Sequence, residues 1–285
     1  MTASLILPDA ILAARDRIAG LARRTPVEPA SYLSDIVGAS CWLKMECWQA
    51  TGSFKMRGAA NRLSQLTQEE RARGVVTASA GSHAIAVATC AVAMQIPAVI
   101  VVATDASPAK VAALQRFDPR WVDLRQIGSD YDEAEAAGIA LARELDRPFI
   151  SPYNDAGVIA GQGTVAVELL EDLPDLDMIL VPVGGGGLAA GIALWAHHVN
   201  PRIQVVGVQS EASPPMHAAF AAGNHVTVPI APSLADALAG NIEVGSITIP
   251  ICLRELASVV LVREIDIAAA MRYVIEDHHL IVEGS

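Results

Sequence analysis

A lysine stands at a point where a helix is expected to begin. Residues 41–61, CWLKMECWQATGSFKMRGAAN, predict a strand, a short turn and a helix start, with Ser53 as the cap and Lys55 in the first turn. The unpaired N–H groups and the dipole at that end of a helix carry partial positive charge, which disfavours an ammonium group. This potential and partial burial favour the neutral amine, the form of lysine that attacks a carbonyl carbon. A surface lysine that bends away from the helix is the alternative explanation.

Four consecutive glycines form the second chemical feature. Residues 178–196, MILVPVGGGGLAAGIALWA, predict a strand, a loop of Gly184, Gly185, Gly186 and Gly187, and a helix. Glycine lacks Cβ, so successive backbone N–H groups can turn toward an anion, and the helix start adds its dipole. A tight turn without a ligand needs only one or two glycines, so the loop favours a phosphate. No Lys-Ser or Lys-Thr pair follows, which excludes a nucleoside-triphosphate P-loop.

The same loop leaves a dinucleotide as an alternative ligand. It satisfies the pattern Gly-x-Gly-x-x-Ala from Gly184 to Ala189. The acidic residue that binds the ribose in such proteins should close the next strand, but that strand ends with Gln209. A reactive lysine together with a separate phosphate loop indicates one cofactor with both an aldehyde and a phosphate. Pyridoxal phosphate meets that description.

Short apolar runs alternate along the chain with longer amphipathic ones. The predicted strands are Cys41–Glu46, Gly74–Ala78, Ala98–Val102, Trp121–Gln126, Met178–Val183 and Gln204–Gln209. The predicted helices are Asp9–Ala22, Ser53–Gln65, His83–Met94, Pro108–Arg116, Asp130–Leu145, Gly157–Leu170, Leu188–His198 and Asp266–Asp277. This alternation predicts an α/β fold with mainly parallel open sheets flanked by helices. Gly161 and Gly163 are expected to allow close helix packing rather than to bind a ligand.

Composition narrows the class of partner. The net charge of −11 argues against a nucleic-acid partner, and a hydrophobic fraction of 52% with only 4% aromatic residues suits buried parallel strands. Proline and glycine interrupt the uncharged tract Met178–Ala196 and the nearly uncharged tract Val75–Thr104, so neither is expected to span a membrane. The four cysteines show no CxxC spacing and the first residues lack a basic signal region. We therefore expect a cytoplasmic protein that handles small molecules.

Three motifs, in this order and spacing, carry a family resemblance. They read TGSFKMRGA, SAGSHAIAVA and VPVGGGGLAAGIA, with supporting matches at VIAGQGTVAVEL and LADALAG. Together they resemble the serine/threonine dehydratase group of pyridoxal-phosphate enzymes, which includes the serine racemases and has the tryptophan-synthase-β-like fold (fold type II). The resemblance runs from about Arg23 to the last residue. The stretch VQSEASPPMHAA also resembles members of the hydroxyectoine-utilisation dehydratase type.

The resemblance implies two lobes and one catalytic lysine. A large domain of residues 1–48 plus 148–285 would bind the cofactor phosphate, and a small inserted domain, residues 49–147, would carry the lysine. Lys55 would form an imine with the cofactor and then, as the base, remove the Cα proton of the substrate. Phe54 would pack beside the cofactor ring.

Other positions acquire roles only through the resemblance. Gly184 to Gly187 would hold the cofactor phosphate, Tyr153 would lie beside the cofactor, and Glu283 would lie near the ring edge. A loop would bind the substrate carboxylate through backbone amides and a serine hydroxyl. Its residues are Ser79, Ala80, Gly81, Ser82 and His83.

The chain departs from the family pattern at several points. Ser82 replaces an Asn that bonds the ring hydroxyl of the cofactor in the family, and the shorter reach of serine implies that this contact is lost or made through water. Ala80 replaces a serine that racemases use on the opposite face of Cα, which favours dehydration over racemisation. Gln209 and Pro215 stand where the family has acidic ligands of a divalent cation, so no metal is expected there. The sequence ends at IVEGS, before a Ser- and Gly-rich turn that contacts the pyridine nitrogen in the family.

These inferences predict a lyase that eliminates water from serine, threonine or a β-hydroxylated relative and releases a 2-oxo acid and ammonia. The resemblance further implies a homodimer. An amino-acid racemase of the same group is one alternative, and a weakly active pyridoxal-phosphate-binding protein is another. A dinucleotide-dependent oxidoreductase is a more distant one.

Overall fold

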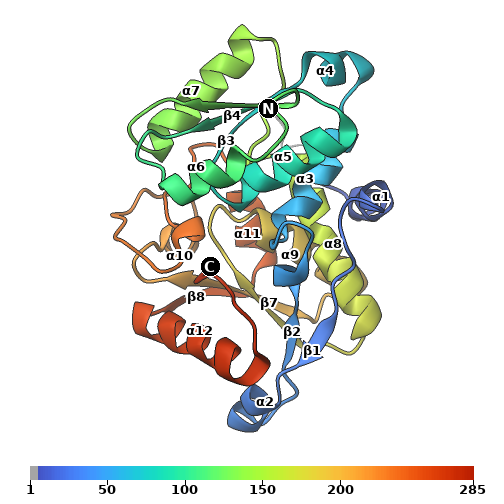
Figure 1. The fold of residues 1–285 in the computed structure, drawn as a ribbon. Coiled ribbons are helices and arrows are strands. Elements are labelled where there is room, and N and C mark those ends of the chain that lie inside the picture. The colour runs from blue at the N-terminus through green and yellow to red at the C-terminus, as the bar shows by residue number, and fades with distance from the viewer. Residues whose placement is uncertain (1–5) are drawn as a thin grey trace. The chain divides into compact units, whose positions relative to one another are not determined.

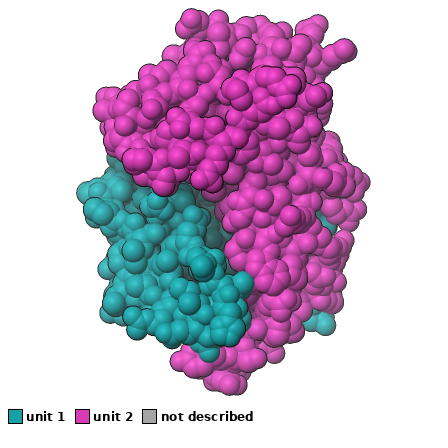
Figure 2. All heavy atoms as spheres, in the orientation of Figure 1, with its two compact units in different colours: residues 1–12, 153–167, 175–285 teal, residues 13–152, 168–174 magenta. Residues whose placement is uncertain are grey.

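The structure is a computed structural model that describes residues 6–285 (Figure 1). The chain divides into two compact units, which Figure 2 colours separately. Unit 1 comprises Met1–Leu12, Tyr153–Val167 and Asp175–Ser285, and unit 2 comprises Ala13–Pro152 and Glu168–Pro174. This division places residues 13–48 in unit 2. The domain limits expected from the sequence stay a prediction.

Unit 2 contains a parallel sheet of three strands in the order β3-β4-β5. The strands are β3 (Val75–Ala78), β4 (Ala98–Val102) and β5 (Val122–Gln126), and the helices around them are α5 (Ser82–Met94), α6 (Pro108–Leu114) and α7 (Tyr131–Glu144). Alternate residues of β4 serve two cores: Val99 and Val101 pack toward α7, whereas Ile100 and Val102 pack toward α5 and α6. Helices therefore cover both faces, which explains why β4 is buried at every position.

The remainder of unit 2 carries the lysine helix and a small ribbon. The helices are α3 (Lys55–Ser64), α4 (Gln68–Arg73), α2 (Ser31–Val37) and the 3-10 turn η1 (Glu46–Trp48). Helix α1 (Pro8–Ile18) begins in unit 1 and continues into unit 2. Strands β1 (Val27–Pro29) and β2 (Trp42–Lys44) pair antiparallel. The strand predicted over 41–46 is thus shorter than expected, because its last residue already belongs to the η1 turn.

Unit 1 contains a second parallel sheet, in the order β6-β7-β8. Its strands are β6 (Met178–Pro182), β7 (Gln204–Ser210) and β8 (Ser258–Val262). Its helical elements are α9 (Gly187–Val199), α10 (Pro215–Ala222), η2 (Asp236–Leu238), α11 (Thr248–Glu255) and α12 (Glu264–His278). Helix α8 (Ala156–Asp172) begins in unit 1, and its last residues from Glu168 belong to unit 2.

Helices α8 and α9 approach each other closely at two glycines. A Cβ added to Gly191 would lie 2.4 Å from the carbonyl oxygen of Ile159, and a Cβ added to Gly163 would lie 2.9 Å from that of Gly191. Both distances are too short for any side chain, so the packing role predicted for Gly163 is confirmed.

All six predicted strands and all eight predicted helices are present, with ends that differ by a few residues. The α/β class with parallel sheets flanked by helices is therefore confirmed. The sequence reading did not include β1, α2, α10, α11 or β8. The short helix α4 was also not predicted, and a capping box of Thr67 and Glu70 begins it.

Within residues 6–285, no helix combines the length and the apolar character needed to cross a membrane.

Candidate functional site

Lys55 is the first residue of helix α3. The sequence predicted Ser53 as its cap, but Phe54 occupies the N-cap position and no side chain caps the helix. The Oγ of Ser53 accepts only a long hydrogen bond from the Lys55 N–H, at 3.3 Å. The reason is that Phe54 already has helical backbone angles, with φ at −54° and ψ at −20°, so the chain turns into the helix one residue after Ser53.

The amine of Lys55 is half-buried and held in place. Its Nζ donates a hydrogen bond of 2.9 Å to the carbonyl oxygen of Pro152 and lies 5.3 Å from the centre of the Phe54 ring. Both neighbours restrict the direction of the side chain.

The predicted carboxylate-binding loop is shorter than expected. Residues Ser79 to Gly81 connect β3 to α5, but α5 begins at Ser82, so Ser82 and His83 form its first turn. The Ser79 Oγ accepts a hydrogen bond from the Gly81 N–H at 3.1 Å. Ala80 packs against the apolar cluster beneath α5. In the described chain, no hydrogen bond uses the N–H groups of Ser82 to Ala84, as is usual for a first helical turn.

His83 is buried beneath this turn, with 2% of its surface exposed. Its Nε2 lies 3.1 Å from the carbonyl oxygen of Ile150, so Nε2 carries the hydrogen and Nδ1 is the acceptor. Within residues 6–285 the buried Nδ1 has no hydrogen-bond partner. Burial, and then the charge of Lys55, lower the pKa of His83 to about 3. The imidazole is therefore neutral at ordinary pH.

The glycine loop lies in unit 1, between β6 and α9. Gly186 is the N-cap of α9 and has a φ of +88°, which only glycine adopts readily. The carbonyl of Gly185 accepts a hydrogen bond of 2.6 Å from Thr248 Oγ1, and that of Gly186 accepts one of 3.7 Å from Cys252 Sγ. In a trans peptide the N–H points opposite to the C=O, so the N–H groups of Gly186 and Gly187 point away from α11.

These N–H groups are available to a ligand. Among the residues that the structure describes, no hydrogen bond uses the N–H of any residue from Gly184 to Ala189. Backbone donors that converge at a helix start form an anion-binding site. The loop therefore has the backbone donors that a phosphate requires, and its role in binding one stays a prediction.

Tyr153 leaves no room for a side chain at Gly185 and crowds Gly187. A Cβ at Gly185 would lie 2.3 Å from Cγ of the Tyr153 ring, and a Cβ at Gly187 would lie 3.0 Å from its Cα. The hydroxyl of Tyr153 accepts a hydrogen bond of 3.0 Å from the Glu243 N–H, which fixes the ring from its other end. Tyr153 thus lies directly on the glycine loop.

The last residues lie against the LADALAG segment of the same unit. Ser285 Oγ accepts a hydrogen bond of 3.2 Å from the Ala237 N–H, and a Cβ at Gly284 would lie 2.3 Å from the carbonyl of Leu234. Glu283 itself is exposed. Its role near the cofactor ring stays a prediction.

The sequence predicted that no metal binds where the family has its divalent cation, at Gln209 and Pro215. This too stays a prediction. Gln209 is buried, and its Oε1 accepts a hydrogen bond of 2.9 Å from the His217 N–H near the start of α10. No cluster of three or more His, Cys, Asp or Glu side chains suited to a metal occurs within residues 6–285.

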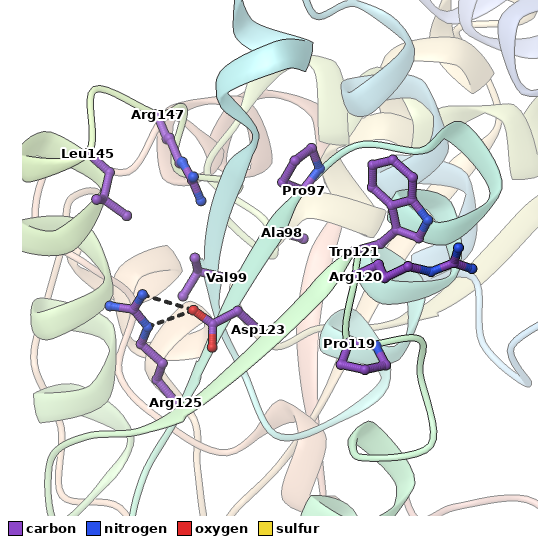
Figure 3. Close-up of a pocket in the computed structure, with 10 residues that line it drawn as sticks. All are labelled: Pro97, Ala98, Val99, Pro119, Arg120, Trp121, Asp123, Arg125, Leu145 and Arg147. Carbon is purple, nitrogen blue, oxygen red and sulfur yellow. Dashed lines mark hydrogen bonds and ion pairs between the residues drawn. The ribbon is translucent and has the colours of Figure 1, made fainter.

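A hollow of about 200 Å³ lies elsewhere, in unit 2 (Figure 3). Pro97 and Trp121 place it at the amino-terminal ends of β4 and β5, and no predicted site residue lines it. Two of the charged side chains that line the hollow form an ion pair, since Arg125 bonds Asp123 at 2.8 Å. Ligand sites of parallel sheets lie at the carboxyl ends of the strands, so we do not assign the function to this hollow.

The comparison with known proteins agrees with these features. Residues 18–285 match the family model described as "Pyridoxal-phosphate dependent enzyme". The chain is 38% identical to an L-threonine ammonia-lyase of Thermotoga maritima over 281 residues, which are 99% of this chain and 69% of that protein. It is 38% identical to the catabolic L-threonine dehydratase of Escherichia coli K12 over 277 residues, which are 97% of this chain and 83% of the relative.

The solved structure of maize serine racemase is also similar. Its TM-score is 0.92 at 34% identity, over 98% of this chain and 83% of that chain. Lyases and a racemase are therefore both among the similar proteins, and their likeness covers almost the whole chain.

Proposed function

We propose that this chain is an ammonia-lyase acting on a small β-hydroxy amino acid. The basis is that it belongs to the family of pyridoxal-phosphate dependent enzymes. The products would be a 2-oxo acid and ammonia. The threonine ammonia-lyase and dehydratase relatives at 38% identity support serine or threonine as the substrate. When bound, pyridoxal phosphate supplies an electron sink that stabilises negative charge at Cα.

The chain has candidate partners for both the phosphate and the aldehyde of this cofactor. The unused N–H groups of Gly184 to Gly187 and the start of α9 would bind the phosphate. Lys55 would hold the aldehyde end through its amine, beside the Phe54 ring, and Tyr153 on the glycine loop would be a further aromatic neighbour of the cofactor. Glu283 and Ser82 are proposed as further ring contacts on the family resemblance alone.

Lys55 would then move the proton that the reaction requires. The Nζ of Lys55 would take the proton from the substrate Cα, and the Cβ hydroxyl would leave with one proton as water, which balances the proton taken. The carbonyl of Pro152, at 2.9 Å, would hold the amine in direction before and after this transfer. The half-buried amine at the first position of α3 is the observation that carries the proposal.

The start of α5 would hold the substrate carboxylate. The N–H groups of Ser82 and His83 point from a helix start, and the Ser79 hydroxyl is adjacent. His83 contributes no charge, because its imidazole is neutral. It would support the turn through its bond to Ile150.

A racemase is the second candidate, since a serine racemase has a closely similar structure. Ala80 disfavours it, because the position carries no hydroxyl for the opposite face of Cα. Chiral analysis of recovered serine separates the two reactions: unchanged configuration with release of ammonia supports the lyase. We further propose a cytoplasmic homodimer with no nucleic-acid or membrane partner, on the family resemblance and the acidic composition.

The chain offers a clean test, because it contains only three lysines, Lys44, Lys55 and Lys110. Pyridoxal phosphate is added, the protein is reduced with borohydride, and the labelled peptide is identified by mass spectrometry. We expect label on Lys55, and loss of ammonia release from serine and threonine in Lys55→Ala. The exposed Lys110 provides the control, as Lys110→Ala should keep full activity. Label on Lys44 or Lys110 alone would contradict the proposal.

A further inference from the structure

Arg57 is a fully buried cation in the first turn of α3, two residues after Lys55. Its guanidinium bonds two carboxylates bidentately. Nε and Nη2 donate to Glu46 at 2.8 and 2.7 Å, and Nη1 and Nη2 donate to Glu168 at 2.6 and 2.8 Å. All of these groups lie in unit 2.

The cluster is balanced in charge and joins distant parts of the sequence. Lys44 Nζ donates to Glu168 at 2.7 Å and to the Thr25 carbonyl at 2.6 Å, and Thr25 Oγ1 donates to Glu46 at 2.5 Å. Two cations therefore face two carboxylates. The cluster ties the first turn of α3 to Thr25 before β1, to the end of β2 with the η1 turn that follows it, and to the last turn of α8.

The presence of a buried ion pair is weak evidence for a stabilising role. Such a pair is often no more stable than apolar side chains of the same volume, although removing one partner is costly. The fork of arginine fixes direction as well as distance, because its five donors are rigidly arranged. Arg57 thus defines the orientation of the turn that carries it.

No side chain caps α3, and the bond from the Lys55 N–H to Ser53 is long, at 3.3 Å. Residues two apart in a helix point in different directions, so Arg57 anchors one side of the turn while Lys55 projects from another. A rotation of the turn would displace the amine from Pro152.

We infer that Arg57 is a positioning residue, which through Glu46 and Glu168 sets the direction of the Lys55 amine. This inference rests on the proposed function, in which Lys55 is the reacting group. Arg57 would not touch the cofactor or the substrate. It would act through the backbone of a single helical turn.

The test compares Arg57→Lys with Arg24→Lys. Arg57→Lys keeps the charge but removes the fork. Arg24 is the matched control, since it forks to Glu171 and Asp172 of the same helix end at the surface. The rate at which pyridoxal phosphate becomes borohydride-fixed to Lys55 is measured per folded molecule, with the melting temperature recorded. In cofactor-free protein, reductive methylation of Lys55 is compared with that of Lys110 as an internal reference.

We expect Arg57→Lys to fix the cofactor roughly 10- to 100-fold more slowly, because misplacing a reacting group by about 1 Å costs that much. Methylation of Lys55 should become faster relative to Lys110, as the amine loses its bond to Pro152, and kcat should fall more than KM changes. Arg24→Lys should match the wild type in the rate of cofactor fixation, in the methylation of Lys55 relative to Lys110, and in kcat and KM. If Arg57→Lys does not fold, the same measurements are made on Glu46→Gln. This variant keeps the ion pair between Arg57 and Glu168.

Wild-type rates in a folded Arg57→Lys or Glu46→Gln variant would overturn the inference and leave the proposed function intact. A wild-type protein that is never labelled at Lys55 would instead overturn the proposed function. The two failures are therefore distinguishable.

Discussion

At the scale of single residues, His83 couples the candidate site to pH. Burial, and then the charge of Lys55, lower the pKa of its imidazole from 6.5 to about 3. Between these values the unfolded chain binds a proton that the folded chain does not bind, so the free energy of unfolding falls as the pH falls. The stability linked to His83 is complete above pH 6.5 and is lost as the pH approaches 3.

We expect His83→Gln to reduce this dependence. The glutamine amide can still donate to the Ile150 carbonyl, but it has no proton to gain. The unfolding free energy from urea denaturation should fall less steeply between pH 6.5 and 4.5 than in the wild type, by up to ~1.4 kcal/mol per pH unit. The exposed His198 supplies the control: His198→Gln should keep the wild-type slope. Parallel slopes for His83→Gln and the wild type would show that His83 is not held neutral.

Residue patterns identified the candidate lysine and the glycine loop because the residues that mark each of them are adjacent in the sequence. Arg57 was missed, since its partner Glu168 lies 111 positions away and only the fold brings the two together. A signal was present in the sequence: an arginine inside a run of small and apolar residues, Met56 to Ala60, has to find a carboxylate when that helix is buried. The sequence alone does not say which carboxylate.

At the scale of elements, the glycine loop and Tyr153 form one packed unit. The loop glycines leave their N–H groups free for an anion, and their lack of Cβ also leaves room for the Tyr153 ring. The sequence argument attributed the glycines to the phosphate alone. Packing is a second cause, and it could not be read from the sequence, because Tyr153 precedes the loop by a whole helix and strand.

A double-mutant cycle separates the two causes. Gly185→Ala alone would place Cβ 2.3 Å from Tyr153 Cγ, so we expect it to lower the unfolding free energy of cofactor-free protein by ~1–3 kcal/mol. In a Tyr153→Ala background the ring is gone, and the same substitution should cost markedly less. Urea denaturation of all four proteins measures the coupling. Equal costs in both backgrounds would mean that the ring does not restrict this position.

The elements that sequence reasoning found are those with a clear period or a long apolar run, such as β4 and α7. The missed elements are short. Strand β1 has three residues and includes Pro29, and α10 begins at Pro215 and runs for eight residues. A run such as that of β8, Ser258–Val262, does not distinguish a strand from a piece of helix by its periodicity. Pairing with a neighbouring strand, rather than local preference, determines β1 and β8.

At the scale of the whole molecule, the proposal requires that Lys55 and the glycine loop bind the same cofactor molecule. If they do, each contact raises the effective concentration of the other, and removing one should weaken binding far more than it would for independent sites. Pyridoxal and pyridoxal phosphate have the same aldehyde and differ only in the phosphate. Comparing the labelling of Lys55 by the two aldehydes therefore measures how much the glycine loop contributes to binding the phosphate.

We expect pyridoxal to occupy Lys55 at least ~100-fold more weakly than pyridoxal phosphate does, measured as the concentration that half-saturates borohydride-fixed label on Lys55. Inorganic phosphate should compete with pyridoxal phosphate but should not inhibit labelling by pyridoxal. Label on the exposed Lys110 should respond equally to both aldehydes, which corrects for their intrinsic reactivity. Equal saturation of Lys55 by the two aldehydes, after that correction, would show that the N–H groups of Gly184 to Gly187 bind no phosphate when Lys55 reacts.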